Sequence, residues 1–129
     1  MIVVDASVLV AASMLADDAA DWARQVIVGD DLAAPHLAPV EAQQAIRRLL
    51  QRDAIDVRIA NQARLDVLAV NLDLHPFAPF ADRVWSLREN LTAYDAWYVA
   101  VAEALDCPLA TLDRRLADAP GLSCDVRTP

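Results

Sequence analysis

The candidate strands of this chain are separated from one another by helical or turn-forming stretches. Short candidate strands occur at residues 1–4, 32–34, 72–74, 109–111 and 122–126, and no Asn-Gly hairpin signal joins any two of them. Strands connected through helices run parallel, because the crossover returns the chain to the same end of the sheet. We therefore predict an α/β fold, a three-layer α/β/α sandwich around a central, mainly parallel sheet of four to five short strands.

The spacing of apolar residues predicts where the helices lie. We expect helices at residues 8–15, 19–27 with Gly29 as the stop, 40–50, 53–70, 77–88 and 93–105, and a short helix or turn at 114–119. Residues 35–39 are predicted to form a loop, and Cys107-Pro108 to stop the helix before it. Within two helices the residues predicted to face inward are Ile55, Ile59, Ala63, Leu65, Leu68 and Ala69, and then Val84, Trp85 and Leu87. No repeat or linker interrupts the 129 residues, so we predict a single domain over 1–129.

The charge balance excludes several classes of protein. The chain has 19 acidic residues, 11 arginines and no lysine, and its formal net charge is -8. An acidic chain does not suit simple phosphate-backbone binding, although a site that gathers divalent cations can still attract a phosphate. Phosphorelay receivers and haloacid-dehalogenase-like phosphatases also place acids at strand ends, but both normally rely on a lysine. We therefore discount both classes.

The sequence favours a cytoplasmic protein without a membrane segment. The apolar N-terminal run contains Asp5 and has no basic residue before Arg24, unlike a signal peptide, and no apolar span is long enough for a membrane helix. Cys107 and Cys124 have no CxxC spacing, so we interpret them as small buried hydrophobic residues in a reducing compartment, with a disulfide as the alternative.

Four acidic residues fall at predicted junctions between elements. Asp5 directly follows the first strand, and Asp113 follows the strand at 109–111. Glu41 and Asp95 lie in the first turns of two helices, and Thr92 is the predicted N-cap of the second. Because the carboxyl ends of parallel strands and the following helix N-termini meet at one edge of a sheet, we expect these four carboxylates to share a crevice. The alternative for each is an ordinary cap or turn residue.

This set of acids suggests a hard divalent cation. Neighbouring carboxylates raise one another's pKa, and Mg²⁺ or Mn²⁺, which prefers oxygen ligands, would relieve that repulsion. Zinc fits poorly, because His36 and His75 have no ligand spacing. One or two such ions can activate water for phosphodiester hydrolysis. Metal-assisted phosphodiester hydrolysis is therefore the predicted reaction class.

Several neighbours of these acids are candidates for supporting roles. Ser7 and Thr111 lie two residues from Asp5 and Asp113, where a hydroxyl can hydrogen-bond a carboxylate or simply end a strand. Asp118 is a candidate extra acid, and otherwise a cap or solvated residue. Arg114 and Arg115 are candidate contacts to the phosphates of such a phosphodiester, and otherwise a solvated turn or partners of Asp118. The aromatic side chains favour core or dimer packing over base stacking: Trp22, Trp85, Trp97, Tyr94 and Tyr98. Glu89 and Glu103 are expected to be solvated.

Four parts of the chain carry a family resemblance: residues 2–7 (I-V-V-D-A-S), Glu41 opening a helix, residues 91–100 (L-T-A-Y-D-A-W-Y-V-A) and residues 109–113 (L-A-T-L-D). In these parts the sequence resembles PIN domains, and more narrowly the VapC-type ribonuclease toxins of bacterial toxin-antitoxin pairs. The resemblance implies a small α/β/α fold, Mg²⁺- or Mn²⁺-dependent RNA cleavage, homodimerisation and neutralisation by a VapB-like antitoxin. It also implies metal-ligand and catalytic roles for Asp5, Glu41, Asp95 and Asp113. The competing hypothesis is a catalytically silent PIN-like module that only binds a partner protein.

Overall fold

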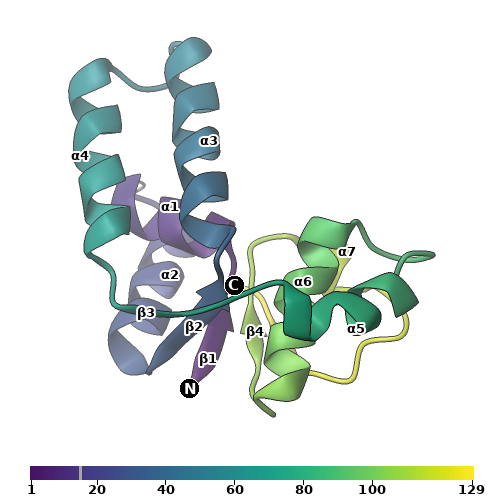
Figure 1. Ribbon diagram of the computed structural model, residues 1–129. Coiled ribbons are helices and arrows are strands. Elements are labelled where there is room, and N and C mark those ends of the chain that lie inside the picture. The colour runs from purple at the N-terminus through teal and green to yellow at the C-terminus, as the bar shows by residue number, and fades with distance from the viewer. Residues whose placement is uncertain (15) are drawn as a thin grey trace.

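A five-stranded sheet lies at the centre of the computed structural model, which describes residues 1–14 and 16–129 (Figure 1). All four strand pairings are parallel, in the order β3-β2-β1-β4-β5. The strands are β1 (Ile2–Val4), β2 (Leu32–Pro35), β3 (Leu72–His75), β4 (Leu109–Ala110) and β5 (Val126–Arg127). The predicted parallel sheet is confirmed, and its carboxyl ends meet at one edge.

Helices lie on both sides of this sheet, which confirms the predicted layers (Figure 1). On one side are α1 (Ala6–Met14) and α2 (Asp18–Gly29), and on the other are the 3₁₀ turn η1 (Ala78–Phe80), α5 (Ala81–Ser86) and α6 (Ala93–Ala104). A hairpin of α3 (Ala38–Gln51) and α4 (Val57–Ala69) extends past the carboxyl edge, and α7 (Arg114–Ala117) connects β4 to β5. Because α6 packs against β1, β2 and β4, it covers the centre of the sheet.

The core explains why the central strands contain so few polar residues. Val3, Val4 and Leu109 are fully buried, as are Val99 and Val101 on α6. A parallel strand covered on both faces has no solvent-facing side, so its sequence is apolar at successive positions instead of alternating. The first polar side chain after β1 therefore lies at the sheet edge.

Side-chain caps begin four of the helices in the described residues, α2, α4, α6 and α7. Asp17 accepts a hydrogen bond from the N–H of Ala20 at 2.8 Å, which confirms the predicted break before α2. Thr92 Oγ1 accepts from the N–H of Asp95 at 3.2 Å, so its predicted N-cap role is also confirmed. The helix predicted at residues 8–15 corresponds to α1, and Leu15 lies outside the described residues.

The loop predicted at residues 35–39 is shorter than expected. Pro35 ends β2, and α3 already begins at Ala38, with Pro39 in its first turn. Proline is compatible with this place, because the first N–H groups of a helix have no intrahelical partner. Glu41 still lies in the first turn of α3, as predicted.

Helix α4 differs from its prediction in both its start and its buried face. The predicted start at Asp53 is wrong, because that residue has a φ of 56° and Asp56 is the N-cap. Buried residues on α4 are Ala60, Ala63 and Val67. The predicted inward residues Ile59, Leu65 and Leu68 are 45%, 51% and 58% exposed. The helix packs against α1 and α3 through a narrow face of mainly small residues, and its larger apolar side chains lie outside that contact.

The helix predicted at residues 77–88 is divided. The 3₁₀ turn η1 precedes α5, which ends at Ser86, whose hydroxyl donates to the carbonyl of Arg83 at 2.7 Å. Such back-bonding competes with continuation of a helix. Trp85 is 69% exposed and lies under the guanidinium of Arg88, so the prediction that it faces inward is wrong.

Helix α6 ends at Ala104 with Leu105 as its C-cap, which confirms the predicted end near Leu105, and the turn that follows includes Asp106 at a φ of 50°. Two other predictions near the end of the chain, for the last strand and for Glu103, are wrong. The last strand is Val126–Arg127 and not residues 122–126, because the N–H of Ser123 donates to the Glu103 carboxylate instead of to a strand. Glu103 is therefore a bonded, partly buried residue and not a solvated one.

Cys107 and Cys124 are free thiols that pack against the core while remaining only half-buried. Burial raises the pKa of the Cys124 thiol to about 11. Within residues 1–14 and 16–129, no helix is both long and apolar enough to cross a membrane.

Candidate active site

Asp5 is a buried carboxylate at the carboxyl end of the central strand β1. Its N–H donates to the carbonyl of Ala110 at 3.1 Å, so the backbone of β4 fixes its position. The side chain lies at a relative exposure of 9%. Burial raises the pKa of this carboxyl, while hydrogen bonds from Ser7 and Thr111 oppose the rise. Burial and the hydroxyl donors therefore act in opposite directions on the charge of Asp5, and burial has the larger effect.

Two hydroxyl groups connect Asp5 to the chain after β4. Ser7 Oγ donates to Asp5 Oδ1 and accepts from the N–H of Leu112 at 3.0 Å. Thr111 Oγ1 donates to Asp5 Oδ2 and accepts from the N–H of Asp113 at 3.0 Å. Each hydroxyl thus both orients Asp5 and fixes the backbone that leads to Asp113.

Glu41 is held by a tyrosine of the opposite helix. The hydroxyl of Tyr98 on α6 donates to Glu41 Oε1 at 2.8 Å. Burial raises the pKa of the Glu41 carboxyl, the Tyr98 hydrogen bond lowers it, and the charges of Asp95 and Asp5 raise it further. The pKa of Tyr98 itself is raised, chiefly by burial, so its hydroxyl remains a donor. This bond joins α3 to α6 across the carboxyl edge of the sheet.

Asp95 lies in the first turn of α6 and is partly buried. Burial raises the pKa of its carboxyl, the hydrogen bond with Thr92 lowers it, and the nearby charge of Asp113 raises it again. The positive charge of Arg115 opposes the rise. The Asp95 carboxyl is thus coupled electrostatically to both members of the Asp113–Arg115 pair.

Asp113 differs from the other three acids because it already has a cationic partner. Arg115 forms a bidentate contact with it, with Nε 3.1 Å from Oδ1 and Nη2 3.0 Å from Oδ2. This contact lowers the pKa of the Asp113 carboxyl. The side chain of Arg115 is 92% exposed, so the pair lies at the rim of the site.

The remaining candidates lie farther out. Arg114 Nη2 donates to the carbonyl of Pro129 at 3.4 Å. Asp118 is the exposed C-cap residue of α7, and no described arginine forms an ion pair with it. The predicted alternative pairing of Arg115 with Asp118 is therefore wrong, and its partner is Asp113.

Together, the four acids form one electrostatically coupled cluster. The charges of Asp5 and Asp95 raise the pKa of Glu41, and the charge of Asp113 raises the pKa of Asp95. All are oxygen donors, and three of the four carboxyls have raised pKa values, which suits a hard divalent cation. As the side chains stand, no three His, Cys, Asp or Glu groups in the described residues are gathered closely enough to ligate one ion. The Tyr98 and Arg115 contacts hold Glu41 and Asp113 in their present positions.

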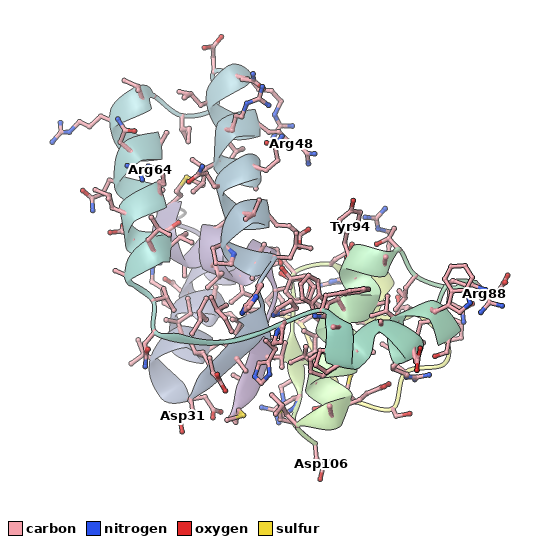
Figure 2. All side chains as sticks on the ribbon, in the orientation of Figure 1. Asp31, Arg48, Arg64, Arg88, Tyr94 and Asp106 are labelled. Carbon is pink, nitrogen blue, oxygen red and sulfur yellow. The ribbon has the colours of Figure 1, made fainter. Side chains whose placement is uncertain are left out.

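Sequence reasoning missed the role of the Tyr98 hydroxyl, although it placed this residue correctly in the core. Tyr98 is 2% exposed and lies three residues after Asp95, which puts both on the same side of α6. That spacing was an available signal. Of the other aromatic residues on α6, Trp97 packs edge-to-face on Phe77, with the ring centroids 5.2 Å apart. Tyr94 instead lies on the solvent side of α6 and is 61% exposed (Figure 2).

A comparison with protein-family models matches residues 2–122 to the PIN domain. The chain belongs to the PIN-domain family. This PIN domain is also 41% identical over 126 residues to Ribonuclease VapC9 of Mycobacterium tuberculosis, covering 98% of the chain and 96% of that protein.

Solved structures agree with this PIN-domain fold. PAE2754 from Pyrobaculum aerophilum superposes with a TM-score of 0.73 at 27% identity, covering 97% of this chain and 81% of that one. VapBC2 from Rickettsia felis, solved bound to a DNA fragment from its promoter, gives a TM-score of 0.67 at 17% identity, covering 99% and 98%. At this low identity, the similarity to VapBC2 shows only that the two proteins share a fold.

Proposed function

We propose that this PIN domain is a divalent-metal-dependent endoribonuclease and the toxin of a toxin-antitoxin pair. The observation that carries the proposal is the coupled cluster of Asp5, Glu41, Asp95 and Asp113 at the carboxyl edge of the sheet. The 41% identity to Ribonuclease VapC9 supports RNA as the substrate. The proposed location is the cytoplasm, where such a substrate is found.

The four carboxylates would hold Mg²⁺ or Mn²⁺, because an all-oxygen acidic donor set suits these ions. When bound, the cation supplies Lewis-acid activation of water and of the phosphodiester. Binding would draw Glu41 and Asp113 inward, at the expense of their contacts with Tyr98 and Arg115. The charges of Asp95 and Asp5 raise the pKa of Glu41, and the charge of Asp113 raises the pKa of Asp95, so an incoming cation would relieve this repulsion.

The neighbouring side chains of the chain have distinct proposed tasks. Ser7 and Thr111 orient the Asp5 carboxylate, and their hydroxyl donors favour its ionised form against the effect of burial. Arg115, once released from Asp113, would contact an RNA phosphate, and Arg114 lies beside it for the same task. Asp118 is proposed only as an outer carboxylate, since α7 separates it from the cluster.

The proposed partners are a VapB-like antitoxin and a second copy of the chain. Similarity of fold to a VapBC2 assembly supports the antitoxin. The homodimer is supported by large apolar side chains that the described fold leaves uncovered, among them Val40 at 65% and Leu68 at 58% exposure.

The experiment compares purified, antitoxin-free protein with two matched variants on total cellular RNA. Asp95→Asn removes a proposed ligand, and Asp82→Asn removes an exposed aspartate from the first turn of another helix, α5. We expect fragments in Mg²⁺ or Mn²⁺, none in chelator, and none from Asp95→Asn, while Asp82→Asn behaves as the wild type. If folded wild-type protein with metal did not cleave RNA, the nuclease proposal would fail. The hypothesis of a catalytically silent, partner-binding module would then be favoured.

A further inference from the structure

Five arginines of the α3–α4 hairpin have no acidic partner. In the part of the chain that the structure describes, ion pairs engage Arg24, Arg83, Arg88, Arg115 and Arg127, and Arg114 bonds a carbonyl. The arginines left without a side-chain bond all belong to one hairpin: Arg47, Arg48, Arg52, Arg58 and Arg64. The hairpin also contains four acidic residues, Glu41, Asp53, Asp56 and Asp66, so its net charge is +1 in a chain of net charge -8.

Two of these arginines are aligned with Glu41 along α3. Arg48 and Arg52 follow Glu41 by seven and eleven residues, which are close to two and three turns of an α-helix. They therefore lie on the same flank as Glu41, about 10 and 16 Å along the helix axis from it. Arg47 is rotated by about 100° from Arg48, onto the outer face. Figure 2 shows Arg48 on the side of α3 that faces α6 and Tyr94.

A hollow accompanies this flank. It has a volume of about 440 Å³ and is lined by Ala45, Arg48, Leu49, Gln51 and Arg52. Ala45 and Leu49 are half-buried, whereas the two arginines are exposed. The hollow thus combines a small apolar surface with two guanidinium groups, and it begins one turn beyond Glu41.

We propose that this flank is an RNA-binding track, on which Arg48 and Arg52 bind phosphates of the strand next to the cleaved bond. The inference rests on the proposed nuclease function. Single-stranded RNA is the occupant that fits, since it carries repeated negative charge at intervals along its length, as the arginines repeat along α3. The track compensates locally for an acidic protein and directs the strand toward Glu41.

The test compares two double variants that lose the same charge. Arg48→Gln/Arg52→Gln removes the track, and Arg47→Gln/Arg58→Gln removes two exposed arginines of the same hairpin that lie off the flank. Binding of a fluorescent single-stranded RNA oligonucleotide is measured in chelator at several salt concentrations, and cleavage is measured separately with Mn²⁺. Circular dichroism checks folding, and the single variant Arg48→Gln replaces the double if it unfolds.

We expect the track variant to lose about tenfold or more in RNA affinity and its salt slope to fall by about 1.4, since each lost single-strand phosphate contact contributes about 0.7. KM should rise with little change in kcat. The control double should lose less. Equal losses of RNA affinity in both double variants would contradict the proposed RNA-binding track. If the wild-type protein bound RNA through Arg48 and Arg52 but did not cleave it, the proposed nuclease function would be contradicted. The proposed RNA-binding track would still be supported.

Discussion

The hydroxyl of Thr111 donates a hydrogen bond to Asp5 Oδ2, although the two residues are 106 positions apart in the sequence. Thr111 is fully buried, and its oxygen also accepts from the N–H of Asp113. One side chain thus sets the orientation of one proposed ligand and the backbone of another. This arrangement makes Thr111 the most direct test of how the site is built.

Thr111→Val should destabilise the protein and reduce RNA cleavage. Valine has nearly the same shape but leaves Asp5 Oδ2 and the N–H of Asp113 without a partner, which costs about 1 to 3 kcal/mol in free energy of unfolding. Cleavage should fall about 10-fold or more, as for other residues that orient metal ligands. Urea denaturation and RNA cleavage provide the measurements. Thr111→Ser, which keeps the hydroxyl, should retain most of the stability and most of the cleavage activity. If Thr111→Val changed neither stability nor cleavage, the role assigned to Thr111 would be contradicted.

Stability without metal should decrease as pH rises. The pKa values of Asp5, Glu41 and Asp95 are raised in the folded state, so folding favours their protonated forms. That stabilisation is complete below the ordinary values of 3.8 to 4.5 and is lost as pH increases through the raised ones. The pKa values of Asp113 and Glu103 are lowered in the folded state, so the stability that these two carboxyls contribute is lost only as pH falls below their ordinary values. Chelated protein should therefore melt at a lower temperature at pH 8 than at pH 5.5.

Asp5→Asn isolates one part of this pH effect. Removing the buried charge should raise the melting temperature of chelated protein at pH 8 by about 4 °C or more, corresponding to about 1 kcal/mol. The gain should shrink as pH falls and be lost below the ordinary value of 3.8, where Asp5 becomes protonated in both states. Asp82→Asn is the control for charge alone. A lower melting temperature for Asp5→Asn at pH 8 would contradict the pKa assignment.

Tyr98→Phe should move the acid limb of the cleavage profile to higher pH. The Tyr98 hydroxyl stabilises the ionised form of Glu41, so its loss raises the pKa of that carboxyl further. Fewer molecules would then carry an ionised Glu41 at neutral pH, and cleavage should fall about 10-fold. The measurement is kcat/KM between pH 5.5 and 8.5. Tyr94→Phe alters an exposed hydroxyl on the same helix, and an identical profile for both variants would refute the prediction.

Arg115→Gln should strengthen binding of Mn²⁺ while weakening binding of RNA. The arginine occupies both oxygens of Asp113, so its removal frees that carboxylate for an ion. We expect a two- to fivefold gain in Mn²⁺ affinity, about the size typical of an exposed ion pair. Isothermal titration calorimetry measures this. Arg127→Gln breaks a comparable pair with Asp125 outside the site, and its Mn²⁺ affinity should not change.

Glu103→Gln should destabilise the side of the protein that contains α5 and α6. Glu103 receives 2.6 and 2.9 Å hydrogen bonds from Arg83 and a 2.7 Å bond from the N–H of Ser123. Arg83 lowers the pKa of this carboxyl, so the stabilisation is present above its ordinary value of 4.5 and is lost as pH falls through the lowered value. The variant should lose about 1 to 2 kcal/mol at pH 7. The difference from wild type should be small at pH 3, and an equal loss at both pH values would argue against an ionic contribution.

Local patterns explain why so much of the fold could be predicted. Strand ends and helix starts are marked by neighbouring residues, so the positions of Asp5, Glu41, Asp95 and Asp113 followed from segments of a few residues. The Tyr98–Glu41 bond could not be predicted in this way, because it joins residues 57 positions apart. The exposed apolar face of α4 was missed for a similar reason, since periodicity shows that a helix has an apolar side but not how much of it the rest of the chain covers.

The neighbouring strands β1 and β4 also set when the site can form during synthesis. Asp5 and Glu41 are translated early, but Thr111 and Asp113 follow only after more than four-fifths of the 129 residues have been made. Until β4 emerges from the ribosome and pairs with β1, Asp5 Oδ2 lacks the hydrogen bond that the Thr111 hydroxyl donates to it. A nascent or prematurely terminated chain that ends before Leu109 would therefore be harmless to the RNA around it, including the messenger that encodes it.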